Sequence, residues 1–187
     1  MITNLKKSEC LKILKNNYIG HLAYVYKNLP FVIPITYYYN RKNITIIGYT
    51  GEGHKTRALR LNNAVSLQVT EIQSIDNWKS VLIQGTFEEL EGPDAKFKLH
   101  KFSIGVKKLI VEKKNRELHF IRQFSNKTHF DSVPVVYRIN IQEITGKEKK
   151  PKINAAYNPT IGLTCAINEK AIASGTKASA TVNPDKI

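Results

Sequence analysis

A period of two in the hydrophobic pattern is the feature that most limits how this chain can fold. Between residues 64 and 70, the apolar side chains of Val65, Leu67 and Val69 alternate with polar ones. Successive side chains of a strand point to opposite faces, so this segment is predicted to be a strand with one buried face. Comparable strand signals occur in five more segments, namely 19–26, 31–39, 44–49, 78–90 and 133–144.

Four-residue polar turns, 27–30 and 40–43, join the first three of these segments and predict a meander over 19–49. Pro34 lies inside the second segment, and proline cannot donate a hydrogen bond to a ladder, so we expect an edge strand or a bulge there. Six antiparallel strands with a few helices predict a mainly β fold, a small barrel with helical plugs.

Two segments change to the helical period. Residues 8–16 predict a short helix that turns Cys10, Ile13 and Leu14 inward, with Ser8 as its N-cap. Residues 95–109 have apolar side chains at three- and four-residue steps, which predicts an amphipathic helix. Its lysines are expected on a solvated face: Lys96, Lys98, Lys101, Lys107 and Lys108. The segment 111–131 gives no clear prediction beyond a helical turn or two at 118–124.

The charge of the chain is strongly positive, with 29 Lys and Arg against 15 Asp and Glu, a net charge of +14. Such a balance attracts anions, including nucleic acid, anionic lipid and phosphorylated small molecules. A nucleic-acid-binding barrel is one alternative. Known nucleic-acid modules and interleaved exposed aromatic residues are missing from the pattern, which disfavours that alternative.

The two cysteines, Cys10 and Cys165, are too few for a disulfide scaffold and fit a reducing cytoplasm. The N-terminus has no apolar core of a secretory signal, and the apolar runs are only as long as strands, so we expect no membrane span. Composition changes after Gly146, and we expect a domain over 1–147 and a loosely held or partner-packed extension over 148–187.

A glycine-rich bend follows the third strand segment and carries the main functional signal. Gly51 and Gly53 let the backbone turn tightly, and a helix that starts there would point free N–H groups into the bend. His54, Lys55 and Arg57 add hydrogen-bond donors and positive charge. These groups suit a phosphate, although an ordinary strand-to-helix turn with an exposed basic first turn would look the same.

Other chemistries have weaker support. The five histidines lack the spacing of a metal site and no carboxylate triad accompanies them, so no metal is expected. The chain has no nucleophile-elbow pattern, no P-loop and no dinucleotide-binding fingerprint.

Taken in order, five segments resemble the pyridoxamine 5′-phosphate oxidase-like family, and within it the nitroimidazole-resistance (Nim-type) proteins. The resemblance covers roughly residues 8–146 and rests on Ile19–Ala23, Pro30–Tyr37, Gly51–Lys55, Asn63–Leu67 and Trp78–Gly85. It implies an FMN-binding split barrel of six antiparallel strands, with FMN between the two subunits of a homodimer. The C-terminal substrate segment of the vitamin B6 oxidases has no counterpart here, so that reaction is not expected.

The resemblance also implies positions for the cofactor. His54 and Lys55 would bind the FMN phosphate, or His54 would face the substrate as the candidate catalytic residue. Other residues would line the flavin or its cleft: Pro34, Ile35, Thr36, Tyr37, Tyr49, Thr50, Gly53, Trp78, Ser80 and Val81. The implied function is that of an FMN-dependent oxidoreductase, with nitroreductase-like chemistry as one form, acting with a small-molecule electron donor or acceptor. A flavin- or haem-binding sensor without turnover is the alternative.

Overall fold

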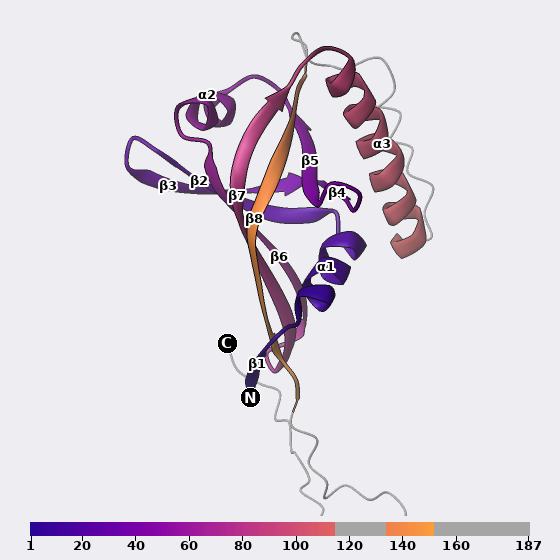
Figure 1. Cartoon of the computed structure of the whole chain (residues 1–187). Coiled ribbons are helices and arrows are strands. Elements are labelled where there is room, and N and C mark those ends of the chain that lie inside the picture. The colour runs from indigo at the N-terminus through magenta and orange to yellow at the C-terminus, as the bar shows by residue number, and fades with distance from the viewer. Residues whose placement is uncertain (115–133, 152–187) are drawn as a thin grey trace, which may run out of the picture. The chain divides into compact units, whose positions relative to one another are not determined.

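The computed structural model describes residues 1–114 and 134–151, which form one large β-sheet with three helices (Figure 1). The strands are β1 Ile2–Asn4, β2 Ile19–Tyr26, β3 Leu29–Thr36, β4 Tyr38–Asn40, β5 Thr45–Thr50, β6 Ala64–Ser74, β7 Asn77–Leu90 and β8 Val135–Lys149. The helices are α1 Lys7–Asn16, α2 His54–Leu61 and α3 Gly92–Lys114.

The strands pair antiparallel in the order β3-β2-β6-β7-β8-β5-β4, and β1 also pairs with β8. The two edge strands, β3 and β4, follow one another in the chain with only Tyr37 between them. The sheet must therefore curl until its two edges meet at Tyr37. This curl produces the open, barrel-like sheet that the sequence pattern predicts, and Pro34 lies on an edge strand as expected.

Three details of the prediction were wrong. The sheet has eight strands instead of six, because β1 was missed and the segment 31–39 is two strands. Tyr37 separates these two strands, and its N–H donates 2.8 Å to the Tyr18 carbonyl. The meander over 19–49 is also absent, since β3 pairs with β2 whereas β5 pairs with β4 and β8.

The core consists of two clusters on opposite sides of β5. Ile46 points into the main cluster inside the curled sheet, and Ile47 points into a smaller cluster that includes Phe102 and Val106 of α3. Because both of its faces are covered, β5 is buried from Thr45 to Gly48.

A bulge on β8 changes which side chains face the core. The register with β7 shifts between Gln84 and Gly85, so that Gln84 pairs with Glu143 and Gly85 with Ile141. A Cβ at Gly85 would lie 2.3 Å from the Asn140 carbonyl oxygen, which explains a glycine at this close approach.

Helix α1 matches its prediction, with Cys10, Ile13 and Leu14 buried against the sheet. The N-cap position is Lys6, not Ser8 as expected. The Glu9 carboxylate accepts the Lys6 backbone N–H at 2.8 Å, so an acidic side chain in the first turn replaces the expected serine cap.

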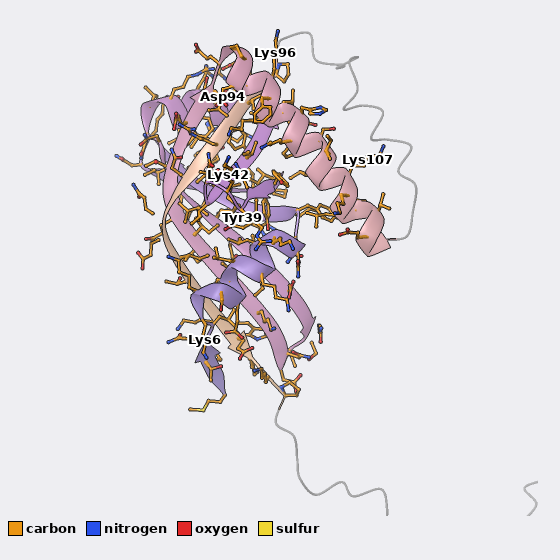
Figure 2. The ribbon with its side chains drawn as sticks, turned by 45° about the vertical axis from the view of Figure 1, so that its right-hand side comes forward. Lys6, Tyr39, Lys42, Asp94, Lys96 and Lys107 are labelled. Atoms are coloured by element: carbon orange, nitrogen blue, oxygen red, sulfur yellow. The ribbon has the colours of Figure 1, made fainter. Side chains whose placement is uncertain are left out.

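Helix α3 packs against β4, β5 and β8 through Phe102, Val106 and Ile110. Lys96 and Lys107, labelled in Figure 2, are exposed as expected of a solvated face. Lys98 differs from that expectation. It is only 8% exposed, and its ammonium lies 3.9 Å from the Asp94 carboxylate.

Within the described part of the chain, no helix combines the length and apolar character needed to cross a bilayer. Strand β8 runs to Lys149, and residues 152–187, with most of the expected extension, lie outside the described residues. The division of the chain after residue 147 stays a prediction. Most of the ambiguous segment 111–131 also lies outside the described residues.

Candidate functional site

The glycine-rich bend carries the chain from β5 into α2. Gly53 is the N-cap of α2 and has an extended backbone, with φ 174°. The Thr56 hydroxyl accepts the Gly53 N–H at 2.9 Å, and Thr56 is fully buried. This contact fixes the first turn of α2, so the free N–H groups at its start point toward the bend.

The acidic residue of the bend is held away from its basic residues by an ion-pair network. Arg60 approaches both carboxylate oxygens of Glu52, at 2.7 and 2.8 Å, and also contacts Glu89 at 2.8 Å. The Glu52 carboxylate also lies 2.9 Å from the Thr56 hydroxyl. Arg60 holds the pKa of Glu52 below its usual range. The negative charge of Glu52 is therefore compensated at Arg60 and does not compensate Lys55.

Lys55 is half-buried, and its ammonium lies 5.9 Å from the centre of the Tyr137 ring on β8. Burial alone lowers its pKa, and no carboxylate lies within ion-pair distance of it in residues 1–114 and 134–151. A partly desolvated cation without a counter-charge has lost hydration that no protein anion replaces. Such an ammonium is suited to bind an anion from outside the protein.

Tyr137, whose ring centre lies 5.9 Å from the Lys55 ammonium, carries a second unsatisfied group. Its side chain is fully buried between Phe87, whose ring centre is 5.1 Å away, and Gly48, where a Cβ would lie 2.5 Å from the phenol oxygen. The Tyr137 hydroxyl is the buried side-chain polar atom for which the described structure gives no hydrogen-bond partner. Native proteins rarely leave such a group unpaired, so we expect a hydrogen-bond partner for this hydroxyl.

His54 points to a different part of the molecule. Its Nδ1 lies 3.3 Å from the Tyr24 hydroxyl, and its ring packs 4.8 Å from Tyr26 and 4.9 Å from Phe31, centre to centre. His54 and Lys55 therefore contact different strands, the β2–β3 hairpin and β8. The expectation that His54 and Lys55 bind one phosphate, or that His54 faces the substrate, stays a prediction.

The predicted site residues fall into three groups. The bend and the end of β5 hold Tyr49, Thr50, Gly53, His54 and Lys55, and Tyr49 also packs edge-on against Phe102 of α3. The outward face of the sheet, opposite the core, holds Pro34, Thr36, Trp78 and Ser80. The core holds Ile35, Tyr37 and Val81.

The outward group has a hollow of its own. Trp78 and Ser80 of β7 line a space of about 270 Å³ together with Gln68 of β6 and the end of β8. The Gln68 amide donates 3.2 Å to the Ser80 hydroxyl. The buried side chains of the core group cannot reach this surface, so only their backbone could contact a ligand.

Sequence reasoning did not assign Tyr137, Tyr24, Tyr26 or Phe31 to the site. In the sequence, Tyr137 occupies an apolar position of the segment 133–144, and a tyrosine in such a position is the signal that it needs a polar partner. Tyr24 and Phe31 are paired across the β2–β3 hairpin with their rings stacked 5.4 Å apart. Among the described residues, no group of three or more His, Cys, Asp or Glu could hold a metal.

Comparison with known proteins agrees with this architecture. A structure described as a FAD-binding protein from Mesorhizobium loti superposes with a TM-score of 0.61 at 26% identity, over 80% of this chain and 99% of that one. A putative 5-nitroimidazole antibiotic resistance protein from Bacteroides thetaiotaomicron has a TM-score of 0.57 at 16% identity, over 79% and 87% of the two chains. At 16% identity, this second match supports the fold alone.

A FAD-binding protein from Mycobacterium smegmatis also shares the fold, with a TM-score of 0.53 at 17% identity over 79% of this chain and 98% of its own. An uncharacterized protein of Rhizobium meliloti is 30% identical over 86 residues, which are 46% of this chain. The match spans 56% of that relative's length.

The family comparison is decisive because it covers most of the chain. The model described as pyridoxamine 5′-phosphate oxidase matches residues 6–148, from the start of α1 to the end of β8. Every strand after β1 lies within that match, as does the bend with Lys55. The chain therefore belongs to the pyridoxamine 5′-phosphate oxidase family, as a split-barrel member similar to flavin-binding and nitroimidazole-resistance proteins.

Proposed function

We propose that this protein binds a flavin, FMN, and works as a flavin-dependent oxidoreductase on a small molecule, with nitroreductase-like chemistry as one form. One observation carries the proposal. The half-buried Lys55, at the start of α2, has no counter-charge among the described residues, and its ammonium lies 5.9 Å from the ring of Tyr137, whose hydroxyl is unsatisfied. Relatives described as FAD-binding share the fold, which favours a flavin as the anion.

These groups fit the phosphate of a flavin. Lys55 would offset part of its charge, and the N–H groups at the start of α2 would donate to its oxygens. A partner for the Tyr137 hydroxyl would remove the one orphaned buried polar atom of the described structure. An aromatic surface of Tyr26, Phe31 and His54 lies next to the bend. It offers apolar contact to a ring system.

The distribution of the predicted residues supports the proposal of a homodimer. The bend group and the outward group, with Trp78 and Ser80, lie on different elements of one chain. The outward face also exposes large apolar side chains, including Ile19, Val25 and Val32. We propose that a second copy covers this face and brings its outward group to the flavin. The cytoplasmic location expected from the cysteine content stays a prediction.

When bound, a flavin supplies hydride or single-electron transfer, and the protein supplies orientation and electrostatics. In this proposal Lys55 and the start of α2 hold the phosphate end. His54, exposed and in contact with the Tyr24 hydroxyl, is the candidate to move a proton or orient a substrate.

The test is a flavin titration of the purified full chain, followed by absorbance, with the released cofactor separated to distinguish FMN from FAD. Lys55→Ala should weaken flavin binding about ten-fold or more, because a charge-assisted hydrogen bond is worth about 1.5–3 kcal/mol. Arg57→Ala is the matched control. Arg57 is an exposed cation in the same turn of α2, and its loss should change the affinity less than three-fold.

A protein that remains colourless with excess FMN and FAD would contradict the proposal. Equal losses in Lys55→Ala and Arg57→Ala would show diffuse attraction by positive charge and not a phosphate site. A steady-state assay with NAD(P)H and a nitroaromatic acceptor then separates an enzyme from a flavin-binding protein without turnover.

A further inference from the structure

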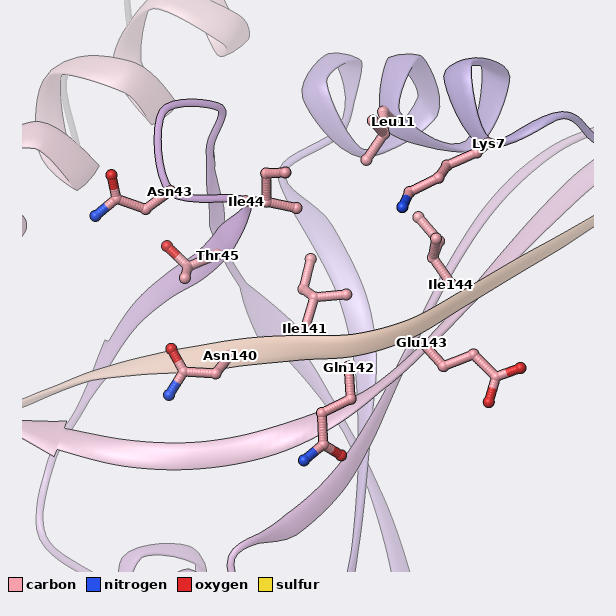
Figure 3. Close-up of a pocket in the computed structure, with 10 residues that line it drawn as sticks. All are labelled: Lys7, Leu11, Asn43, Ile44, Thr45, Asn140, Ile141, Gln142, Glu143 and Ile144. Atoms are coloured by element: carbon pink, nitrogen blue, oxygen red, sulfur yellow. The ribbon is translucent and has the colours of Figure 1, made fainter.

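Two adjoining hollows lie between α1 and the turn at residues 41–44, on either side of Leu11 and Ile44. The first, about 510 Å³, is lined by Lys12, Lys15 and Arg41 together with Tyr39, Leu11 and Ile44, and we name it the cationic groove. The second, about 450 Å³, continues toward β8, and Figure 3 shows Lys7 and Leu11 projecting into it from α1. Neither hollow is lined by a residue of the bend at α2.

The charge around the cationic groove is uncompensated. Lys12 and Lys15 lie one turn apart on the same side of α1, and Arg41 faces them from the turn. No carboxylate lines the groove, and none of the three cations has an ion-pair partner in the described part of the chain. Arg60 and Arg138, by contrast, each contact a carboxylate. Cations gathered around a concave surface focus positive potential into it.

The floor of the groove is apolar and left open. Tyr39 is almost fully buried, and Arg41 is close enough to oppose the rise that burial causes in the pKa of this tyrosine. Ile44 is 46% exposed and has φ 52°, a left-handed conformation that is costly for a β-branched residue. Because the Ile44 side chain is partly exposed, its burial does not offset the energetic cost of this backbone conformation. An exposed apolar side chain held in a strained conformation at the rim suggests contact with a ligand.

We propose that the cationic groove binds a phosphate monoester with an apolar or aromatic body. Arg41, Lys12 and Lys15 would hold the phosphate, and Leu11, Ile44 and Tyr39 would contact the body. The volume of the groove lies within the range of small-molecule sites. The site is separate from the proposed flavin site, since it is built from α1 and the turn before β5 and contains no residue of α2.

The experiment measures binding of 1-naphthyl phosphate to the purified full chain by calorimetry at low salt, with 1-naphthol and inorganic phosphate as the two partial ligands. The whole probe should bind at least ten-fold more tightly than either part. Arg41→Gln and Lys15→Gln should each weaken it about ten-fold. Lys42→Gln is the matched control, because Lys42 is an exposed cation in the same turn that does not line the groove (Figure 2).

Three results would overturn the proposal. The first is that 1-naphthyl phosphate binds no more tightly than 1-naphthol, and the second is that Lys42→Gln weakens it as much as Arg41→Gln. The third is that Lys55→Ala abolishes binding while Arg41→Gln leaves it intact, which would place the only anion site at the bend. FMN is itself an aromatic phosphate monoester, so the flavin titration is repeated with both variants. Flavin binding that is unchanged in Arg41→Gln and weakened in Lys55→Ala separates the two sites, so the flavin proposal and this one fail independently.

Discussion

Two buried tyrosines give opposite predictions for the same chemical change. Tyr37 and Tyr137 are both fully buried, and burial raises the pKa of each. The Tyr37 hydroxyl donates 3.1 Å to the Leu14 carbonyl, whereas the Tyr137 hydroxyl has no partner within the described residues. Replacing tyrosine with phenylalanine removes a satisfied hydroxyl in the first case and an unsatisfied one in the second.

The magnitudes follow from these environments. Tyr37→Phe loses a hydrogen bond of about 1 kcal/mol and leaves a carbonyl in the last turn of α1 without its partner, so we expect a loss of about 1–2 kcal/mol. Tyr137→Phe removes a buried polar atom whose desolvation costs about 1–3 kcal/mol, so we expect flavin-free protein to gain about 1 kcal/mol or more. For a chain of this length, 1 kcal/mol corresponds to a shift of about 2–4 °C in Tm.

The assay is urea unfolding of flavin-free wild type and both variants, repeated with saturating FMN. Tyr137→Phe should raise the urea midpoint without flavin and should gain less from added FMN than wild type, since the flavin phosphate would lose a donor. Equal destabilisation by Tyr37→Phe and Tyr137→Phe would refute the reasoning, because it would show that the Tyr137 hydroxyl is already satisfied in the flavin-free protein.

Two further predictions concern packing and pH. A Cβ at Gly105 would lie 2.2 Å from the Tyr38 ring, so Gly105→Ala should overpack this contact, cost about 1–3 kcal/mol of stability and lower Tm. In a Tyr38→Ala background the clash is absent and only helix propensity acts, so the same substitution should raise Tm. Burial lowers the pKa of Lys55 from 10.5, so the folded state disfavours its charge at neutral pH. Lys55→Met should therefore raise the urea midpoint of flavin-free protein at pH 7. This gain should shrink as pH rises through the depressed pKa toward 10.5, and a pH-independent gain would contradict the burial argument.

The strand pattern was predictable because period-two alternation is a local property. Residues 64–70 and 78–90 became β6 and β7, and Cys10, Ile13 and Leu14 face the core as their spacing requires. The break at Tyr37 was not predictable. Phe31, Ile33, Ile35 and Tyr37 fit one face of a single strand, and only the pairing of β3 with β2 and of β4 with β5 divides residues 31–39.

The directions in which charged side chains point could likewise not be predicted from the sequence. Lys98 has the spacing of a surface lysine, yet it is only 8% exposed and its ammonium lies 3.9 Å from the Asp94 carboxylate. His54 and Lys55 are neighbours in the chain and were expected to act on one phosphate. In the first turn of α2, His54 points toward the β2–β3 hairpin and Lys55 points toward Tyr137.

The sequence by itself determined the mainly β fold, the position of the bend between β5 and α2, and the net charge of +14. Each of these depends on composition or on residues close in the chain. Only the tertiary structure decided which cations stay uncompensated. Glu52 is three residues from Lys55, but α2 brings Arg60 to it, and Arg60 also contacts Glu89 on the distant strand β7. Tertiary packing likewise places the ring of Tyr137 5.9 Å from the Lys55 ammonium and leaves Arg41 facing Lys12 and Lys15. Whether a cation has a counter-charge depends on which carboxylates lie close to it in space, and the curl of the sheet sets those distances.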